Sequence, residues 1–368
     1  MKKKVAVAMS GGVDSSLCAA LLQEQGYEVL GITMQLSDDS REVAGVSTAA
    51  KDAKRVADFL GIEHVVADFR TLFSERVVDY FLTEYLTART PNPCVVCNRF
   101  LKFGELFAFA REKGADFLAT GHYARIEQEA DGAVALKKGK DVKKDQSYVL
   151  YHLPREILPH ILFPLGNYRK EETRTIAKRR GLPVADKAES QEICFVPEDD
   201  YKAYLSQHRP HSFHAGDIVN MQGEVLGQHK GLPFYTIGQR KGLGIAAEQP
   251  LYVIALDREN NRVIVGENEA VYASSLLAKD VNWLIDAPIG EISVRAKIRY
   301  GNREAEAHVL PMSDGRVRVA FPEPQRAVTP GQSVVFYAGD RLLGGAVIES
   351  QAWKNSLTHR ALCDIIGR

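Results

Sequence analysis

The stretch VAVAMSGGVDSSLCAALL, from Val5 to Leu22, indicates the fold of the amino-terminal region. A short apolar run around Val7 is typical of a buried strand, and leucines at helical spacing after Ser15 predict a helix. Between them lies a turn that begins at Ser10 and holds two glycines and several serine hydroxyls. Glycines let backbone N–H groups point toward one spot, and a helix N-terminus attracts anions. The stretch therefore predicts a strand, a phosphate-binding turn and a helix.

The turn lacks the lysine of a Walker-type loop, since no lysine occurs between Lys4 and Lys51. Ordinary γ-phosphoryl transfer is therefore disfavoured. The pattern SGGVDS, from Ser10 to Ser15, resembles the SGGxDS loop of the N-type ATP pyrophosphatases, which hold the pyrophosphate end of ATP while a nucleophile attacks the α-phosphate. This resemblance implies adenylation with release of AMP. The alternative is a Ser/Gly connector between strand and helix with no ligand.

Size and composition indicate a globular protein of two or three domains. The chain has 368 residues, 45% of them hydrophobic, and its 47 Lys and Arg balance 47 Asp and Glu. A nucleic-acid partner would therefore have to be recognised by local basic clusters. No apolar run approaches the roughly 20 residues of a membrane span. We expect a cytoplasmic protein without a membrane partner.

Alternating strand and helix patterns in the first 203 residues predict a doubly wound, parallel α/β sheet. The expected strands after the first are 27–36, 62–68 and 116–120, and the expected helices are 48–60, 101–111 and 170–180. Ligands of such sheets bind beyond the carboxyl ends of the strands. Ser10, Met34 and Gly121 all fall at such ends.

Beyond about Tyr204 alternating apolar residues and frequent glycines predict β-structure. Residues 251–256 and 262–265 are expected to form a hairpin, and 292–300 shows clean alternation. We predict a catalytic domain over 1–203, a small, mainly β central domain over 204–278, and a carboxyl-terminal β-barrel over 279–368.

Five scattered cysteines argue against a secreted disulfide framework. Packing explains Cys18, and Cys363 has no evident partner. Cys94 and Cys97 form a CxxC pair that fits half a zinc site, a redox pair or a reactive thiol pair. We expect a helix starting near Leu101, and the nearby Arg99, to lower the pKa of the pair.

Seven motifs in order across nearly the whole chain resemble the bacterial tRNA-specific 2-thiouridylase family. They are SGGVDS at Ser10, NPCVVCN around Cys97, GHYA at Gly121, KDQSY at Lys144, SQEICF around Cys194, GQRKGLG at Gly238 and RY at Arg299.

The resemblance implies that ATP, with Mg²⁺, adenylates the C2 oxygen of a wobble uridine, so that sulfur can displace AMP. The residues implied to bind ATP are Ala8, Met9, Ser10, Gly11, Gly12, Val13, Asp14, Ser15, Met34 and Gly121. Cys194 corresponds to the cysteine that carries a persulfide, and Cys97 to the second catalytic cysteine. A transient Cys97–Cys194 disulfide would then form and require reduction. The implied sulfur donor is a cysteine desulfurase or a sulfur-relay protein.

The implied RNA partner is tRNA of the Lys, Glu and Gln species. The resemblance implies target-base contact by Asn92, Pro93 and Cys94, and tRNA contact by His122, Lys144, Asp145, Gln146, Arg299, Tyr300 and Gln332. Without the resemblance, the lysine-rich run 136–145 would be read as a solvated loop. Tyr123 and Phe195 are candidates for stacking on a flipped base.

Cys94 departs from the family pattern, because many members carry Asp there. A carboxylate role is therefore in doubt at this position. One hypothesis is that Cys94, Cys97 and Cys194 ligate a [4Fe–4S] cluster with one open iron.

Two other functions remain open. An amidotransferase-type synthetase would adenylate its substrate without needing Cys97 and Cys194. A non-catalytic tRNA-binding protein or thiol redox sensor would have no need of the SGGVDS loop.

Overall fold

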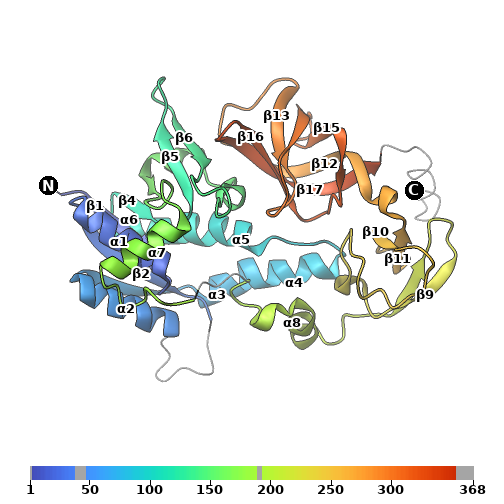
Figure 1. Ribbon diagram of the computed structural model, residues 1–368, viewed down its shortest axis with the longest axis horizontal. Helices are drawn as coiled ribbons and strands as arrows, with labels where there is room; N and C mark the ends of the chain where they lie inside the picture. The colour runs from blue at the N-terminus through green and yellow to red at the C-terminus, as the bar shows by residue number, and fades with distance from the viewer. Residues whose placement is uncertain (1, 38–46, 189–192, 354–368) are drawn as a thin grey trace. The chain divides into compact units, whose positions relative to one another are not determined.

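The computed structural model describes residues 2–37, 47–188 and 193–353, and the chain divides into two compact units (Figure 1). The first unit comprises Met1–Val78, Cys94–Gln191 and Gly339–Leu343. The second comprises Asp79–Pro93, Glu192–Ala338 and Gly344–Arg368. Within the described ranges no helix is both long and apolar enough to cross a membrane.

A parallel sheet forms the centre of the first unit, in the order β3-β2-β1-β4-β7. Its strands are β1 (Lys4–Ala8), β2 (Glu28–Gln35), β3 (Glu63–Asp68), β4 (Phe117–Ala119) and β7 (Ile161–Leu162). The first four were predicted, whereas the two-residue β7 was not. The strand order reverses between β1 and β4, which is where an open α/β sheet forms its ligand crevice.

Three helices of the first unit were also predicted: α1 (Val13–Glu24), α2 (Thr48–Leu60) and α7 (Lys170–Arg179). α1 contacts both α2 and α7, and its residues join those of β1 in one buried cluster. The bounds of α2 follow from local caps, because the Ser47 hydroxyl accepts from the Ala50 N–H and Gly61 ends the helix at φ 66°.

The helix expected to start near Leu101 instead begins at Pro93. It runs through α5 (Pro93–Val96), the π-helical segment η2 (Cys97–Glu105) and α6 (Leu106–Glu112). Proline suits a first helical turn because its missing N–H has no intrahelical acceptor there. Cys94 and Cys97 therefore lie within the helical segment.

The remaining elements of the first unit connect the strands of the parallel sheet and the helices described above. They are α3 (Arg70–Phe73), η1 (Ser74–Val78), the hairpin β5 (Ala124–Gln128) and β6 (Val134–Lys138), η3 (Ser147–Leu150) and η4 (Arg155–His160). The start of β17 pairs with this hairpin, Arg341 opposite Lys137.

The second unit contains helix α4 (Asp79–Leu86), helix α8 (Tyr201–His208) and a four-stranded sheet in the order β10-β11-β8-β9. These strands are β8 (Gly216–Val219), β9 (Val225–His229), β10 (Tyr252–Asp257) and β11 (Arg262–Gly266). The predicted β10–β11 hairpin is confirmed as an antiparallel pair. Short 3₁₀ turns lie at η5 (Pro197–Asp199), η6 (Leu232–Phe234) and η7 (Asn268–Val271).

The carboxyl-terminal strands form the predicted β-barrel. They are β12 (Tyr272–Trp283), β13 (Ile292–Lys297), β14 (Ala305–Pro311), β15 (Val317–Arg326), β16 (Ser333–Ala338) and β17 (Arg341–Trp353). Antiparallel pairing of β12 with β17 closes the barrel. The alternation predicted in β13 is confirmed, since Val294 and Ala296 are buried while Arg295 is exposed.

Gly216 on β8 provides a test of this packing. A Cβ at Gly216 would lie 2.1 Å from the Asn261 carbonyl oxygen, so we expect Gly216→Ala to lower the free energy of unfolding by about 1–3 kcal/mol. Gly290→Ala is the matched control, because a Cβ there meets nothing within 4 Å. Urea unfolding of both variants measures the difference, and equal stabilities would contradict the packing described here.

Candidate active site

The loop between β1 and α1 is tied together by its own hydroxyl groups. The Ser10 N–H donates to Ser15 Oγ at 3.2 Å, and the Ser16 hydroxyl donates to the Gly12 carbonyl at 2.8 Å. Gly11 has φ 67°, and a Cβ there would lie 2.5 Å from the Ala49 carbonyl oxygen. Only glycine fits this turn, as predicted from the sequence.

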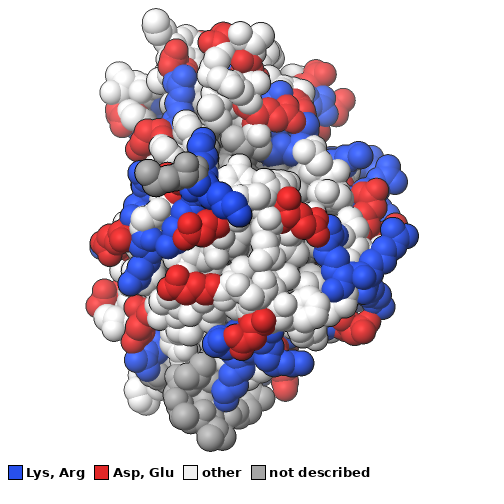
Figure 2. Space-filling view, turned by 90° about the vertical axis from the view of Figure 1, so that its left-hand side faces the viewer, with Lys and Arg blue, Asp and Glu red and all other residues white. Residues whose placement is uncertain are grey.

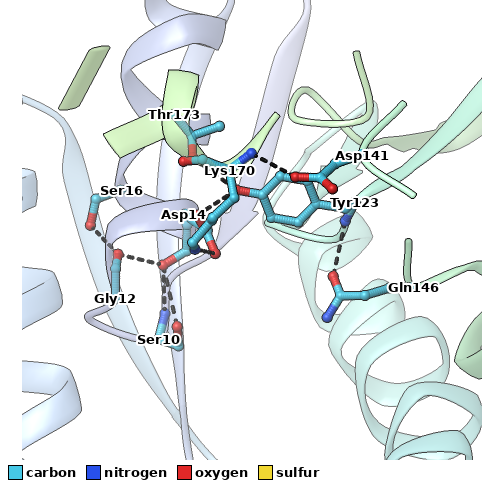
Figure 3. A network of polar contacts seen from close by, with 10 residues as sticks. Ser10, Gly12, Asp14, Ser16, Tyr123, Asp141, Gln146, Lys170 and Thr173 are labelled. Carbon is cyan, nitrogen blue, oxygen red and sulfur yellow. Dashed lines mark hydrogen bonds and ion pairs between the residues drawn. The ribbon is translucent and has the colours of Figure 1, made fainter. Parts of the chain in front are cut away.

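The Asp14 carboxylate, in the first turn of α1, is held through both of its oxygens (Figure 3). The Tyr123 hydroxyl donates to Oδ1 at 2.9 Å, and Lys170 Nζ donates to Oδ2 at 2.6 Å. The Lys170 side chain is only 11% exposed and that of Asp14 26%. Three segments distant in sequence thus meet at one carboxylate.

Tyr123 is a fixed donor in this network. Burial raises its pKa far above the ordinary tyrosine value, and the negative charge of Asp14 adds to the effect. Its hydroxyl also lies 2.9 Å from Thr173 Oγ1, on α7. Since Tyr123 is buried and engaged here, the prediction that it stacks on a flipped base is wrong.

A second lysine reaches the loop from beyond α7. Lys187 Nζ donates to Asp52 Oδ2 at 2.6 Å and to the Gly11 carbonyl at 3.1 Å. Sequence reasoning missed both Lys170 and Lys187 as parts of this site. They follow the loop by more than 150 residues, so no local motif links them to it.

The other residues implied to bind ATP adjoin the loop. A Cβ at Gly121, two residues after β4, would lie 3.1 Å from the Ser15 nitrogen, so these two backbone segments are in close contact. Met34 lies at the carboxyl end of β2, the strand next to β1. The structure thus brings together the loop, the end of β2 and Gly121, as expected from the strand ends.

The two thiols of the CxxC pair have raised, not lowered, pKa values. Cys97 is 9% exposed, and burial raises its pKa although the positive charge of Lys102 opposes this. Cys94 is exposed as a residue, yet desolvation around its thiol also raises its pKa. The prediction that Arg99 and a helix N-terminus lower these values is wrong, because burial outweighs the neighbouring charge.

His122 is a buried histidine. Its Nδ1 lies 2.6 Å from Thr120 Oγ1, and burial lowers its pKa well below the ordinary histidine value. Two residues of the KDQSY motif also make internal contacts. Asp145 Oδ1 accepts from the Gly139 N–H at 2.9 Å, and Gln146 Oε1 accepts from the Tyr123 N–H at 2.9 Å.

Cys194 and several residues with implied RNA contacts belong to the second unit. Cys194 is exposed on a turn, and Tyr300 is 44% exposed. Arg299 Nη2 donates to Thr329 Oγ1 at 2.7 Å, and Gln332 Nε2 donates to the Thr90 and Pro91 carbonyls at 3.0 and 3.1 Å. Three residues of the SQEICF motif, Ser190, Gln191 and Glu192, lie outside the described residues, as does Cys363.

The hypothesis of an iron–sulfur cluster on Cys94, Cys97 and Cys194 gains no support from the described residues. In the part of the chain that is described, no three His, Cys, Asp or Glu side chains gather in a way that would hold a metal ion. Cys94 and Cys97 belong to the first unit and Cys194 to the second.

Three family models match successive parts of the chain. They are the tRNA methyl transferase HUP domain over residues 3–198, the tRNA methyl transferase PRC-barrel domain over 202–267 and the aminomethyltransferase beta-barrel domain over 273–348.

Curated relatives match over nearly their whole length. The tRNA-specific 2-thiouridylase MnmA 1 of Caldanaerobacter subterraneus is 51% identical over 361 residues, covering 95% of this chain and 99% of that protein. The MnmA of Moorella thermoacetica is 52% identical over 354 residues, covering 94% and 99%. That of Pelotomaculum thermopropionicum is 51% identical over 358 residues, covering 95% and 98%. With this identity along almost the entire sequence, the chain belongs to the family of bacterial tRNA-specific 2-thiouridylases.

Proposed function

We propose that the protein is a cytoplasmic enzyme that replaces the C2 oxygen of the wobble uridine of tRNA with sulfur, at the expense of ATP. The observation that carries the proposal is the SGGVDS loop with two lysines, Lys170 and Lys187, at its edge. The C2 oxygen of uridine would have to leave as oxide, which is a poor leaving group. ATP must therefore adenylate this oxygen first, so that a sulfur nucleophile can displace it as part of AMP.

The loop suits the pyrophosphate end of ATP for electrostatic reasons. The Gly12 N-cap position of α1 makes no side-chain cap, so the N–H groups of the first turn can donate to phosphate oxygens. Lys170 and Lys187 are each paired with one carboxylate, Asp14 and Asp52. We propose that both ammonium groups turn toward the triphosphate when it binds.

The Asp14 pairings also bear on the metal that accompanies ATP. Both carboxylate oxygens already accept hydrogen bonds, from Tyr123 and from Lys170. We therefore propose that Mg²⁺ is held by the phosphates and water, and that Asp14 positions Lys170. When bound, Mg²⁺ would neutralise part of the triphosphate charge.

The sulfur steps assign one role to each catalytic cysteine. The terminal sulfur of a Cys194 persulfide attacks C2 of the adenylated uridine, and the C2–O bond breaks as AMP leaves with the oxygen. The Cys97 thiolate then attacks the Cys194 sulfur and the persulfide S–S bond breaks, leaving its electron pair on the thiouridine sulfur. A Cys97–Cys194 disulfide results, and an external dithiol must supply two electrons to reduce it. No step uses a cluster.

The raised pKa of Cys97 fits its late role in this sequence. Burial disfavours the Cys97 thiolate, and the positive charge of Lys102 would stabilise that thiolate when it forms. The sulfur donor is proposed to be a cysteine desulfurase or a relay protein.

We propose local tRNA contacts, because the chain has no net charge. On the face seen in Figure 2, basic and acidic side chains are interspersed. The proposed target-base contacts are Asn92, Pro93 and Cys94, and the proposed tRNA contacts are His122, Lys144, Asp145, Gln146, Arg299, Tyr300 and Gln332.

The substrates are proposed to be tRNAs for Lys, Glu and Gln. We propose that three domains together bind and modify the tRNA: a catalytic domain (1–203), a central domain (204–278) and a barrel domain (279–368).

The ATP site is tested by Lys170→Met, with Lys178→Met on the same helix as the control. Lys178 pairs with Asp186 at the surface. Removing one charge-assisted contact to a transition state costs about 10²-fold or more in rate, so we expect that loss in tRNA-dependent AMP formation for Lys170→Met alone. Melting temperatures check folding. Equal AMP formation by a folded Lys170→Met would contradict the proposed site.

The sulfur chemistry is tested with a cysteine desulfurase, [³⁵S]cysteine and unmodified tRNA. We expect label to reach tRNA only with ATP, and to reach none in Cys194→Ala or Cys97→Ala. Cys18→Ala is the control, since the Cys18 thiol is completely buried and donates to the Thr120 carbonyl. Continued labelling of tRNA by Cys194→Ala would exclude the persulfide role. ATP consumption without labelling by the wild type would favour another adenylating enzyme.

A further inference from the structure

Helix α4 contacts two segments of the second unit that the proposed reaction must bring together. One is the stretch that leads from α4 to Asn92 and Pro93, the proposed target-base contacts. The other carries Cys194 and continues into α8. Both segments are attached to α4 by separate sets of contacts.

Aromatic rings attach the Cys194 segment to α4. The ring of Phe195 lies 5.2 Å from that of Phe81 in an edge-to-face arrangement, and 5.5 Å from that of Tyr204. Phe81 is completely buried and contacts the rings of both Phe195 and Tyr204, so it is the central ring of this cluster. Burial, and then the charges of Asp79 and of the Cys194 thiolate, raise the pKa of Tyr204, in agreement with a short separation between Tyr204 and Cys194.

The backbone just after Cys194 is strained, and it is held on both sides. Glu198 and Asp199 have φ 56° and 54°, a left-handed conformation that is unfavourable for residues with a side chain. Before them Phe195 packs on α4, and after them Tyr201 stacks on Tyr85 of α4 with ring centroids 4.8 Å apart. Strained backbone persists where surrounding structure fixes it, and such sites cluster where geometry matters for function.

The target-base segment is fixed to the same helix and to the barrel. A hydrogen bond joins the backbone of Asn92 to the Tyr80 phenol, on α4. The Thr90 N–H donates to the Pro330 carbonyl at 2.9 Å, and a Cβ at Gly331 would lie 2.8 Å from the Thr90 carbonyl oxygen. Gln332 also donates to Thr90, as described above.

We propose that α4 positions the Cys194 sulfur relative to the target uridine, and that the Phe195 ring, seated on Phe81, is the positioning contact. This proposal rests on the proposed function. Cys194 must be exposed to accept sulfur from another protein, and then it must deliver that sulfur to one carbon atom. Reacting atoms must approach to about 3–3.5 Å, and a 1 Å displacement costs about 10²-fold in rate. A flexible loop would meet the first requirement and fail the second.

The experiment separates loading from delivery. Enzyme is loaded with [³⁵S]persulfide by a desulfurase, the label on the protein is counted, and ATP and excess tRNA then start a single turnover. Phe195→Leu removes the ring and keeps an apolar side chain. Phe195→Tyr keeps the ring. Phe213→Leu is the matched control, because Phe213 forms a comparable pair with Phe234, centroids 4.9 Å apart, in the same unit.

We expect Phe195→Leu to load normally and to form AMP with tRNA, but to deliver sulfur about 10- to 100-fold more slowly than the wild type. Phe195→Tyr and Phe213→Leu should deliver at nearly the wild-type rate. Delivery by Phe195→Leu at the wild-type rate, or an equal loss in Phe213→Leu, would overturn the positioning role while leaving the proposed function intact. Absence of any persulfide on wild-type Cys194 would instead overturn the proposed function itself.

Discussion

The ion pair between Asp14 and Lys170 is the interaction on which the first unit's site depends. Together with the Tyr123 hydroxyl it joins the β1–α1 loop, the segment after β4 and the start of α7. A loop rich in glycine and serine has little stiffness of its own, so these long-range contacts fix its shape. The Lys170 ammonium and the Asp14 carboxylate together carry no net charge, and the same holds for the pair of Lys187 and Asp52. These pairings keep electrostatic repulsion beside the loop low, and in the proposed function the negative charge of a triphosphate would draw both lysines toward it.

Local signals explain which parts of this architecture were predictable. The bounds of α2 follow from Ser47 and Gly61, neighbours of the helix in sequence, and the β10–β11 hairpin follows from its alternating apolar residues. The helix beginning at Pro93 was missed because the apolar pattern becomes regular only at Leu101. Lys170 and Lys187 were missed as site residues for a different reason, and so was the contact of the buried Tyr123 with Asp14. Their contacts to the loop span more than 100 residues, and burial by distant segments also reversed the expected pKa shift of Cys97.

The division of the chain assigns the proposed chemistry to two bodies. The nucleotide loop and Cys97 belong to the first unit, whereas Cys194 and the residues leading to Pro93 belong to the second. The boundary falls at the peptide bond between Pro93 and Cys94, inside the proposed target-base segment. The aromatic seat of Phe195 on α4 then explains how an exposed cysteine can keep a defined position within its own unit.

The central claim is that ATP activates the C2 oxygen of the uridine, and the fate of that oxygen tests it most directly. An anticodon stem-loop RNA carrying ¹⁸O at C2 of the wobble uridine is incubated with the enzyme, ATP and a sulfur source, and the AMP is analysed by mass spectrometry. The account predicts one ¹⁸O atom in the phosphate of the AMP for each thiouridine formed. AMP without the label, in a reaction that still yields thiouridine, would contradict adenylation of this oxygen.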